Sequence, residues 1–285
     1  MTTETVMTQR TYLPGTQIEI VNPAIPRGHI RHAVFDFDGT LSLIREGWQK
    51  VMIPMGVEFL RETSTTETDE ELYCVVEEFV TRLTGKQTIY QMIELKNEVE
   101  KRGGTAKDPV EYKHIYLDRL WERIKDRVSG LKSNTLDPRD FVVPGSYELL
   151  ESLKSRSVLM YLASGTDIPY VRDESAVLKV SGYFEPHIYG AIDDYKKMSK
   201  KIIIEKLIRE NHLSGSELLT FGDGFVEIEN TKEVGGITVG VASDEVNKTG
   251  IDEWKRNRLL RAGADLIIPH FLEYSRLLAY LFNEE

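Results

Sequence analysis

Ala33-Val34-Phe35-Asp36-Phe37-Asp38-Gly39-Thr40 is a short apolar run that ends in two acids and a glycine. A run of this kind is typical of a strand buried in a parallel sheet. In extended backbone, residues two apart point the same way, so the carboxylates of Asp36 and Asp38 can converge on one site. Two such charges repel each other unless a cation is present, and Mg²⁺ prefers carboxylate, water and phosphate oxygens. The alternative interpretation is a plain surface turn of the Asp-Gly type.

The chain after Pro144 alternates between apolar strands and amphipathic helices. Strands are expected at residues 158–163, 218–221, 237–241 and 266–268, with helices such as 200–209 and 252–261 between them. This alternation predicts an α/β fold with a doubly wound, Rossmann-like parallel sheet. Ligands bind such sheets at the carboxyl ends of the strands, so the polar residues that follow each strand are the candidates for chemistry.

A long helical block separates the first strand from the others. Helices are expected at 47–62, with a bend at Pro54, and at 88–102. A third is predicted by the apolar stripe from Leu72 to Leu83, with Asp69 as a possible cap. The fourth has Asp108 as N-cap, Pro109 in its first turn and Gly130 at its end, and its apolar stripe is Leu117-Leu120-Trp121-Ile124-Val128. Four helices predict a small bundle. We therefore divide the chain into an N-terminal arm (1–30), a core (31–43 and 141–285) and a helical cap inserted in the core (44–140). Residues 18–21 of the arm are compatible with a short edge strand.

The composition excludes several classes of protein. The chain has 285 residues and a formal net charge of −10, which argues against nucleic acid as a partner because gripping its backbone needs a basic surface. No apolar run reaches the roughly 18 residues of a membrane span, and no signal peptide is visible, so a cytoplasmic protein is expected. Cys74 is the one cysteine and is expected to be a small buried hydrophobe. The histidines show no zinc-ligand spacing, and nothing in the sequence indicates an oligomeric state.

The second strand of the core is followed by Ser164-Gly165-Thr166-Asp167. A hydroxyl and free backbone amides at a helix N-terminus make an anion site, which would use Ser164 and Gly165. Thr166 or Asp167 alternatively caps the next helix. Both interpretations can hold together.

A basic run, residues 196–201, opens an apolar helix with Ser199 as its expected N-cap. One lysine here can neutralise a phosphate and a nucleophile together, and we expect it to be Lys200, with Lys197 as the second choice. The alternative interpretation, a solvated basic run, must hold for the remaining lysines.

Gly222-Asp223-Gly224 follows another strand, and Glu227 lies four residues after Asp223 at the start of a helix. Residues at this spacing share a helix face, so the two acids can supply a metal ligand and a second acid that holds metal-bound water. The alternative is a turn followed by a helix acid that the helix dipole favours.

These four features, in this order and each at a strand end, resemble the motifs of the haloacid dehalogenase superfamily. The first motif is matched by Asp36 to Thr40, the second by Ser164, the third by Lys200, and the fourth by Gly222-Asp223-Gly224 with Glu227, where Asp is commoner. The resemblance covers residues 31–283, and it implies that the helical insertion is a type-1 cap.

The resemblance implies a phosphohydrolase mechanism. Asp36 would form an aspartyl-phosphate, and Asp38 would act as acid and then as base. Mg²⁺ would be held by Asp36, the backbone carbonyl of Asp38 and Asp223, with Glu227 as the further acid of the metal site, whereas Ser164 and Lys200 would hold the phosphoryl oxygens. Members that act as dehalogenases or phosphonatases lack an acid at the position of Asp38, so phosphate ester chemistry is implied.

The substrate is expected to be a small phosphorylated metabolite between core and cap, with a sugar phosphate favoured and nucleotides possible. Arg45 and Lys86 are candidates to bind it together with Gly165, as are Glu46, Trp48 and the loop 84–88, although each of these cap residues could equally be packing or surface charge. Two other functions stay open: a phosphomutase of the β-phosphoglucomutase type, and a non-catalytic phosphate-binding regulator.

Overall fold

A seven-stranded sheet forms the centre of the protein in the computed structural model, which describes residues 10–192 and 194–284. The strands are β1 (Glu19–Ile20), β2 (His32–Phe35), β3 (Leu159–Asp167), β4 (Ile188–Ala191), β5 (Leu218–Gly222), β6 (Ile237–Val241) and β7 (Leu266–Ile268). Their order is β1-β7-β6-β5-β2-β3-β4, and every pair is parallel except β1 with β7. Strand β2 therefore lies between β3, the next core strand along the chain, and β5, which the chain reaches later on the opposite side of β2. A ligand crevice is expected at this switch point.

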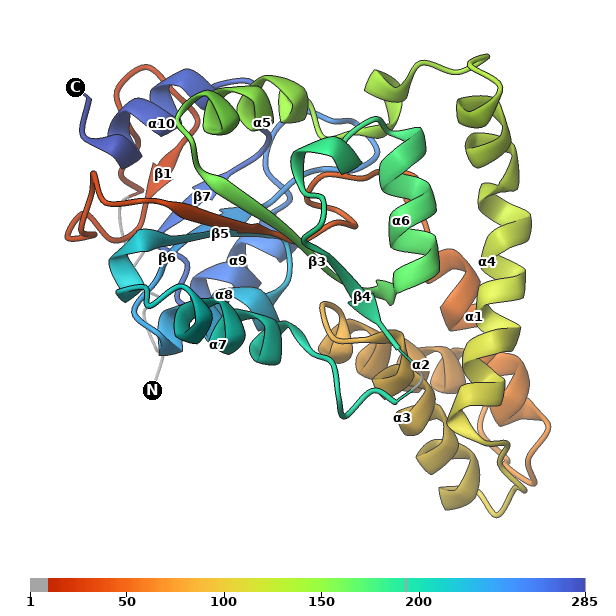
Figure 1. The fold of residues 1–285 in the computed structure, drawn as a ribbon. Helices are drawn as coiled ribbons and strands as arrows, with labels where there is room; N and C mark the ends of the chain where they lie inside the picture. The colour runs from red at the N-terminus through yellow and green to blue at the C-terminus, as the bar shows by residue number, and fades with distance from the viewer. Residues whose placement is uncertain (1–9, 193, 285) are drawn as a thin grey trace, which may run out of the picture.

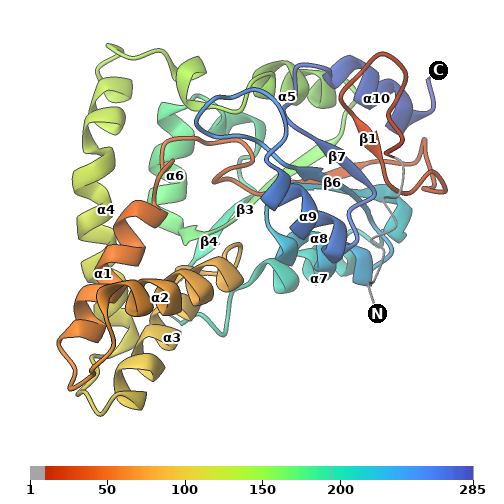
Figure 2. The same cartoon turned by 180° about the vertical axis from the view of Figure 1, so that it is seen from behind.

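Helices cover both faces of the sheet. They are α5 (Ser146–Ser155), α6 (Ile168–Val177), α7 (Lys200–Glu210), α8 (Phe225–Glu233), α9 (Glu253–Ala262) and α10 (Tyr274–Phe282), with short 3₁₀ helices at Pro138–Phe141, Ser181–Tyr183 and Gly215–Glu217. Figures 1 and 2 show α5 and α10 on one face and α7, α8 and α9 on the other. Strand side chains alternate between the faces, so Val34 packs with Ile204 and Leu207 of α7, whereas Ala33 and Phe35 join the larger core.

Four helices form a bundle beside the sheet, as the sequence predicts (Figure 1). They are α1 (Gln49–Arg61), α2 (Asp69–Leu83), α3 (Thr88–Lys101) and α4 (Pro109–Lys132), and α1 contains Pro54. Asp108 caps α4 through a hydrogen bond from the Val110 amide, as expected. The domain limits assigned from the sequence stay a prediction.

Several details of the predicted bundle are wrong. Helix α4 continues past Gly130 to Lys132; the missing side chain at Gly130 instead leaves room for Leu136 to pack. Trp121 is 41% exposed, because the buried stripe of α4 repeats every four residues and Trp121 lies one residue beyond Leu120. Cys74 is exposed, since it lies on the face of α2 opposite the buried stripe.

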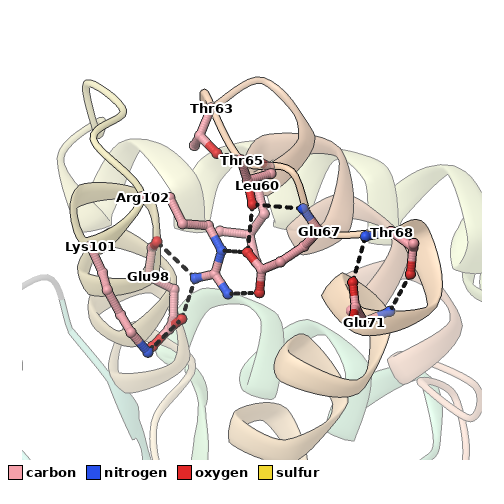
Figure 3. A network of polar contacts seen from close by, with 9 residues as sticks. All are labelled: Leu60, Thr63, Thr65, Glu67, Thr68, Glu71, Glu98, Lys101 and Arg102. Carbon is pink, nitrogen blue, oxygen red and sulfur yellow. Dashed lines mark hydrogen bonds and ion pairs between the residues drawn. The ribbon is translucent and has the colours of Figure 1, made fainter.

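The start of α2 is fixed by Thr68 rather than by Asp69. Thr68 accepts a hydrogen bond from the Glu71 amide, and the Glu71 side chain accepts one from the Thr68 amide, which is a capping box. Figure 3 shows the adjoining loop, where Arg102 from the end of α3 binds Glu67 and Glu98. The polar loop between α1 and α2 is thereby held against α3.

The N-terminal segment packs against the core from residue 10 onward. The predicted edge strand is present as β1, and Leu13, Ile18 and Ile25 are buried. Glu19 of β1 forms a buried, two-point ion pair with Arg256 of α9, with nitrogen–oxygen distances of 2.6 Å. The edge of the sheet is therefore closed by this segment, and its assignment as an arm stays a prediction for residues 1–9, which lie outside the described residues.

Two features of the sheet differ from the sequence prediction. Strand β3 does not end at Ala163 but continues to Asp167 through an irregularity in its pairing with β4. Strand β4 itself was not predicted, because Ile188-Tyr189-Gly190-Ala191 is short and contains a glycine. Ser164 and Thr166 thus lie on an extension of the sheet that points toward the bundle.

Candidate active site

Asp36 follows β2 at the centre of the sheet and is buried, with 6% of its surface exposed. Its amide donates to the Phe221 carbonyl of β5 at 2.9 Å, which continues the strand pairing up to this residue. Gly39, three residues later, has a φ of +79° and lies against the carboxylate of Asp223, so a side chain there would be strained and would collide with that acid. The sharp turn that the sequence predicts is present.

Lys200 joins Asp36 to Glu227. Its ammonium lies 2.8 Å from Asp36 Oδ2 and 2.8 Å from Glu227 Oε2. Burial raises the pKa of Asp36 well above its ordinary value, the charge of Lys200 opposes this, and the carboxylates of Glu227 and Asp223 raise it further. Lys197, the second choice, is exposed and pairs with Asp194. Lys200 is therefore the lysine that the fold brings to Asp36.

Asp38 turns its carboxylate toward the end of β3. Asp38 Oδ2 accepts hydrogen bonds from Ser164 Oγ at 3.3 Å and Thr166 Oγ1 at 2.8 Å. Thr166 therefore does not cap the next helix. Asp167 occupies the N-cap position of α6 but makes no capping bond, because its carboxylate pairs with Lys113 at 2.8 Å. Asp38 Oδ1 is buried without a hydrogen-bond partner among the described residues.

Asp223 belongs to a second ion-pair network that sequence reasoning missed. Lys255 of α9 lies 2.9 Å from Asp223 Oδ2 and 2.7 Å from Glu245 Oε1. Its ammonium also contacts Ser243 Oγ at 3.3 Å, and that hydroxyl donates to the Gly39 carbonyl at 2.8 Å. Glu245 could have been found from the sequence, because it follows β6 as the other candidates follow their strands. Lys255 lies inside a helix and carried no such signal.

A divalent cation fits the carboxylates at this end of the sheet. Asp36, Asp223 and Glu227 each offer one oxygen, and the three oxygens lie within 4.8 Å of one another. The carboxylates of Asp38 and Glu245 lie beside this group, whereas Lys200 and Lys255 are the ammonium groups bonded to it. This excess of buried negative charge calls for a cation, and an all-oxygen donor set suits Mg²⁺.

A cavity of about 100 Å³ lies between these acids and the helical bundle. The loop 84–88 covers it: Gly85 packs backbone to backbone on Gly224, and the Lys86 carbonyl lies against Gly165. The Gln87 side chain donates to the Met198 carbonyl beside α7. Gly165 thus lines the cavity, its role in binding substrate stays a prediction, and the loop docks on residues of two sequence motifs.

The predicted substrate-binding residues of the bundle have different surroundings. Arg45 lines the cavity and is buried, with Glu174 as its ion-pair partner at 2.7 Å. Trp48 also lines it, and Glu46 does so while paired with Arg127 at 3.1 Å. Lys86 reaches the cavity with its loop, but its ammonium lies 6.0 Å from the ring of Phe225 and 5.7 Å from that of Tyr90.

Comparison with protein families agrees with this geometry. Residues 30–235 match the family model described as haloacid dehalogenase-like hydrolase. This chain belongs to that family. The largely parallel sheet with helices on both faces is the fold that the resemblance implied. No match to a curated protein was found.

Solved structures with the same fold include other members of the haloacid dehalogenase family. A predicted phosphoglycolate phosphatase from Haemophilus somnus is 13% identical with a TM-score of 0.58, and the match covers 87% of this chain and 98% of that one. A β-phosphoglucomutase from Clostridium difficile is 15% identical with a TM-score of 0.57, covering 90% and 98%. CbbY from Rhodobacter sphaeroides in complex with xylulose-(1,5)bisphosphate is 15% identical with a TM-score of 0.55, covering 86% and 96%. Identities this low support the shared fold alone.

A search for membrane spans among the described residues found no helix of sufficient length and apolar character.

Proposed function

We propose that this haloacid dehalogenase-like hydrolase is a Mg²⁺-dependent phosphatase that hydrolyses a small phosphate monoester through an aspartyl-phosphate on Asp36. The observation that carries the proposal is the arrangement of two carboxylates in different surroundings. Asp36 is buried against the Lys200 ammonium, whereas Asp38 is held by two hydroxyl groups beside the cavity. These surroundings support a nucleophilic role for Asp36 and a proton-transfer role for Asp38.

The first half-reaction follows from these positions. A carboxylate oxygen of Asp36 bonds to phosphorus while the bond from phosphorus to the ester oxygen breaks, and Asp38 protonates that oxygen as the alcohol leaves. In the second half-reaction, a water molecule gives a proton to Asp38 and attacks the aspartyl-phosphate. Inorganic phosphate is released, and both acids return to their starting state.

The surrounding groups stabilise charge during these steps. The Lys200 ammonium and the Ser164 hydroxyl line the cavity beside Asp36 and Asp38 and can donate to phosphoryl oxygens. Mg²⁺, held by Asp36, Asp223 and Glu227, would supply the positive charge that lets a dianionic phosphate approach these acids. An ester oxygen leaves poorly without a proton, whereas a halide needs none, so Asp38 favours an oxygen leaving group.

A phosphomutase is the second candidate, because it would use the same residues and differ only in returning the phosphoryl group to a substrate. One structure that shares the fold is named as a β-phosphoglucomutase. A mutase needs a bisphosphate or a phosphorylated enzyme to prime each cycle, whereas a phosphatase releases phosphate in every turnover. Steady phosphate release therefore separates the two functions.

The test is phosphate release from a panel of sugar phosphates, nucleotides and an aryl phosphate, with Mg²⁺ and with a chelator. We expect Mg²⁺-dependent release from at least one monoester and loss of turnover in Asp36→Asn, which removes the nucleophile but keeps the size of the side chain. Asp194→Asn, which changes an exposed acid outside the site, is the matched control and should keep full activity. Undiminished turnover in Asp36→Asn would rule out the aspartyl-phosphate mechanism.

A further inference from the structure

On the bundle side of the cavity, two buried residues carry polar groups that have no hydrogen-bond partner among the described residues. Gln91 of α3 and Tyr116 of α4 line the cavity, and each is 4% exposed. Neither side chain makes a hydrogen bond within residues 10–192 and 194–284. Buried amides and hydroxyls are nearly always hydrogen-bonded in folded proteins. The Gln91 amide and the Tyr116 hydroxyl, which line the same cavity, are therefore suited to hydrogen-bond a ligand.

Arg45 adds a third donor, but its charge is already balanced. Its Nε and Nη2 atoms donate to Glu174, which is 2% exposed, at distances from 2.7 to 3.1 Å. The nitrogen Nη1 has no hydrogen-bond partner in the described structure. The pKa of Arg45 is raised because the carboxylates of Glu174 and Asp38 outweigh the effect of burial, so the guanidinium is charged. Arg45 and Glu174 together form a neutral pair that still offers one donor.

Lys86 is the one cation on the described part of this side that forms no ion pair with a carboxylate. Its residue lines the cavity, but its ammonium lies 5.7 Å from the ring of Tyr90 and 6.0 Å from that of Phe225, and neither ring lines the cavity. Asp38 lies 3.8 Å from Arg45 and Glu46 contributes a further carboxylate, which Arg127 balances. A substrate carboxylate or second phosphate would therefore lose its hydration without gaining a counter-charge.

The size of the cavity sets a second limit. One water molecule occupies roughly 10 to 15 Å³ of such a cavity, so a cavity of about 100 Å³ holds on the order of ten non-hydrogen atoms. The phosphoryl group uses about half of them. The remaining volume matches an alcohol of about three or four carbons.

We infer that Gln91, Tyr116 and the Arg45–Glu174 pair form a subsite for the leaving group, and that it takes a neutral polyhydroxylated alcohol of about three or four carbons. This assignment rests on the proposed phosphatase function and names its substrate class. Gln91 and Tyr116 hydrogen-bond the hydroxyl groups of the alcohol, and Arg45 donates a further hydrogen bond without attracting an anion.

Matched phosphate esters test the subsite. Glycerol 3-phosphate and erythritol 4-phosphate carry hydroxyls, whereas 3-phosphoglycerate and 4-phosphoerythronate have a carboxylate in place of the terminal alcohol. Ethyl phosphate carries no distal group and reports the chemistry alone. We expect kcat/KM for the hydroxyl compounds to exceed that of ethyl phosphate and of the carboxylates by about tenfold or more. Equal or faster turnover of the carboxylates would overturn the subsite. No release from any ester would overturn the phosphatase function and the subsite with it.

Two conservative variants locate the contacts. Gln91→Leu and Tyr116→Phe should each lower kcat/KM for glycerol 3-phosphate by about tenfold and leave kcat/KM for ethyl phosphate within about twofold. Tyr112→Phe, one turn away on the same helix and outside the cavity, is the control and should change neither value. Equal losses on both esters would show a structural role only and would contradict the assignment.

Glu174→Gln tests the neutral pair through a gain of activity on an anionic substrate, whereas the two variants above test a loss. Loss of the balancing carboxylate leaves Arg45 with an unopposed charge, so the ratio of kcat/KM for 3-phosphoglycerate to that for glycerol 3-phosphate should rise by about tenfold. An unchanged ratio in a folded variant would contradict the neutral pair. If the variant does not fold, Gln91→Leu and Tyr116→Phe decide the outcome alone.

Discussion

Lys255 donates to two carboxylates at once, and its effect on the metal site is decided by two opposing forces. Its hydrogen bond at 2.9 Å fixes the orientation of Asp223, whereas its charge repels a cation nearby. Lys255→Met removes both effects and Lys255→Gln removes only the charge. Because orientation of metal ligands contributes about 10- to 100-fold to affinity, we expect Lys255→Met to weaken Mg²⁺ binding by that range. Lys255→Gln should bind Mg²⁺ as tightly as the native protein or more tightly.

Calorimetric titration of the purified variants with Mg²⁺ measures these affinities without relying on turnover. Lys179→Met, at a surface position outside the site, serves as the control. Equal tightening in Lys255→Met and Lys255→Gln would mean that the lysine only repels the metal and does not orient Asp223.

The individual residues found from the sequence are those fixed by local spacing. Asp36 and Asp38 share a strand end, and Lys200 and Glu227 begin helices, so each position follows from neighbouring residues. Glu174 and Tyr116 could not be found in this way. Tyr116 of α4 lines the cavity, and Glu174 of α6 pairs with Arg45, which lines it. The docking of two helices, rather than any local pattern, places them there.

At the level of elements, the loop between α1 and α2 depends on one arginine (Figure 3). Glu67 accepts hydrogen bonds from Arg102 Nη2 at 2.7 Å and from Thr65 at 2.6 Å, and these bonds lower the pKa of Glu67 to about 2. The folded pKa lies below the ordinary value of 4.5, so the stabilisation is present above pH 4.5 and is lost as the pH falls toward 2. Glu67→Gln should therefore lower the free energy of unfolding by about 0.5–1 kcal/mol at pH 7 and by less at pH 3.

Denaturant unfolding of Glu67→Gln and the native protein between pH 7 and pH 3 measures this difference. Glu77→Gln removes an exposed carboxylate of α2 that forms no ion pair in the described structure, and its effect should not vary with pH in this way. If the free energy of unfolding differed by the same amount at every pH between 7 and 3, Arg102 would not stabilise the charged form of Glu67 over the neutral form.

Helices proved easier to predict than the ends of strands. The four helices of the bundle carry long periodic stripes, and their limits follow from caps such as Asp108 and from turn residues. Strand β3 was predicted too short because its last residues are polar, and only pairing with β4 extends it. A sequence pattern shows which side chains are apolar, but it does not show which neighbouring backbone is available for pairing. The irregular end of β3 therefore could not be predicted from the sequence.

At the scale of the whole molecule, Arg258 connects the core to the helical bundle. It projects from α9 and donates to the carbonyls of Thr81 at 2.6 Å, Arg82 at 3.0 Å and Thr84 at 2.6 Å, at the C-terminal end of α2. The last carbonyls of a helix lack the amide partners of an interior turn, and here the Thr81 carbonyl accepts only a long bond of 3.4 Å from the Thr84 amide. The charge of Arg258 also suits the negative end of the helix dipole. The bonds hold the loop 84–88 over the cavity, so they stabilise the closed arrangement of core and bundle.

We expect Arg258→Met to shift the protein toward an open arrangement. The variant keeps an unbranched apolar side chain but loses the guanidinium, and with it all three bonds to the carbonyls and the cation–π contacts with the rings of Phe225 and Trp254. Amide hydrogen exchange should accelerate by about tenfold or more in residues 81–88, and kcat/KM for the preferred ester should fall by about tenfold as kcat and KM change together. Arg261→Met replaces an exposed arginine of the same helix and should alter neither quantity. Native-like protection of residues 81–88 in Arg258→Met would show that the backbone contact of Gly85 with Gly224, rather than the arginine, keeps the cavity covered.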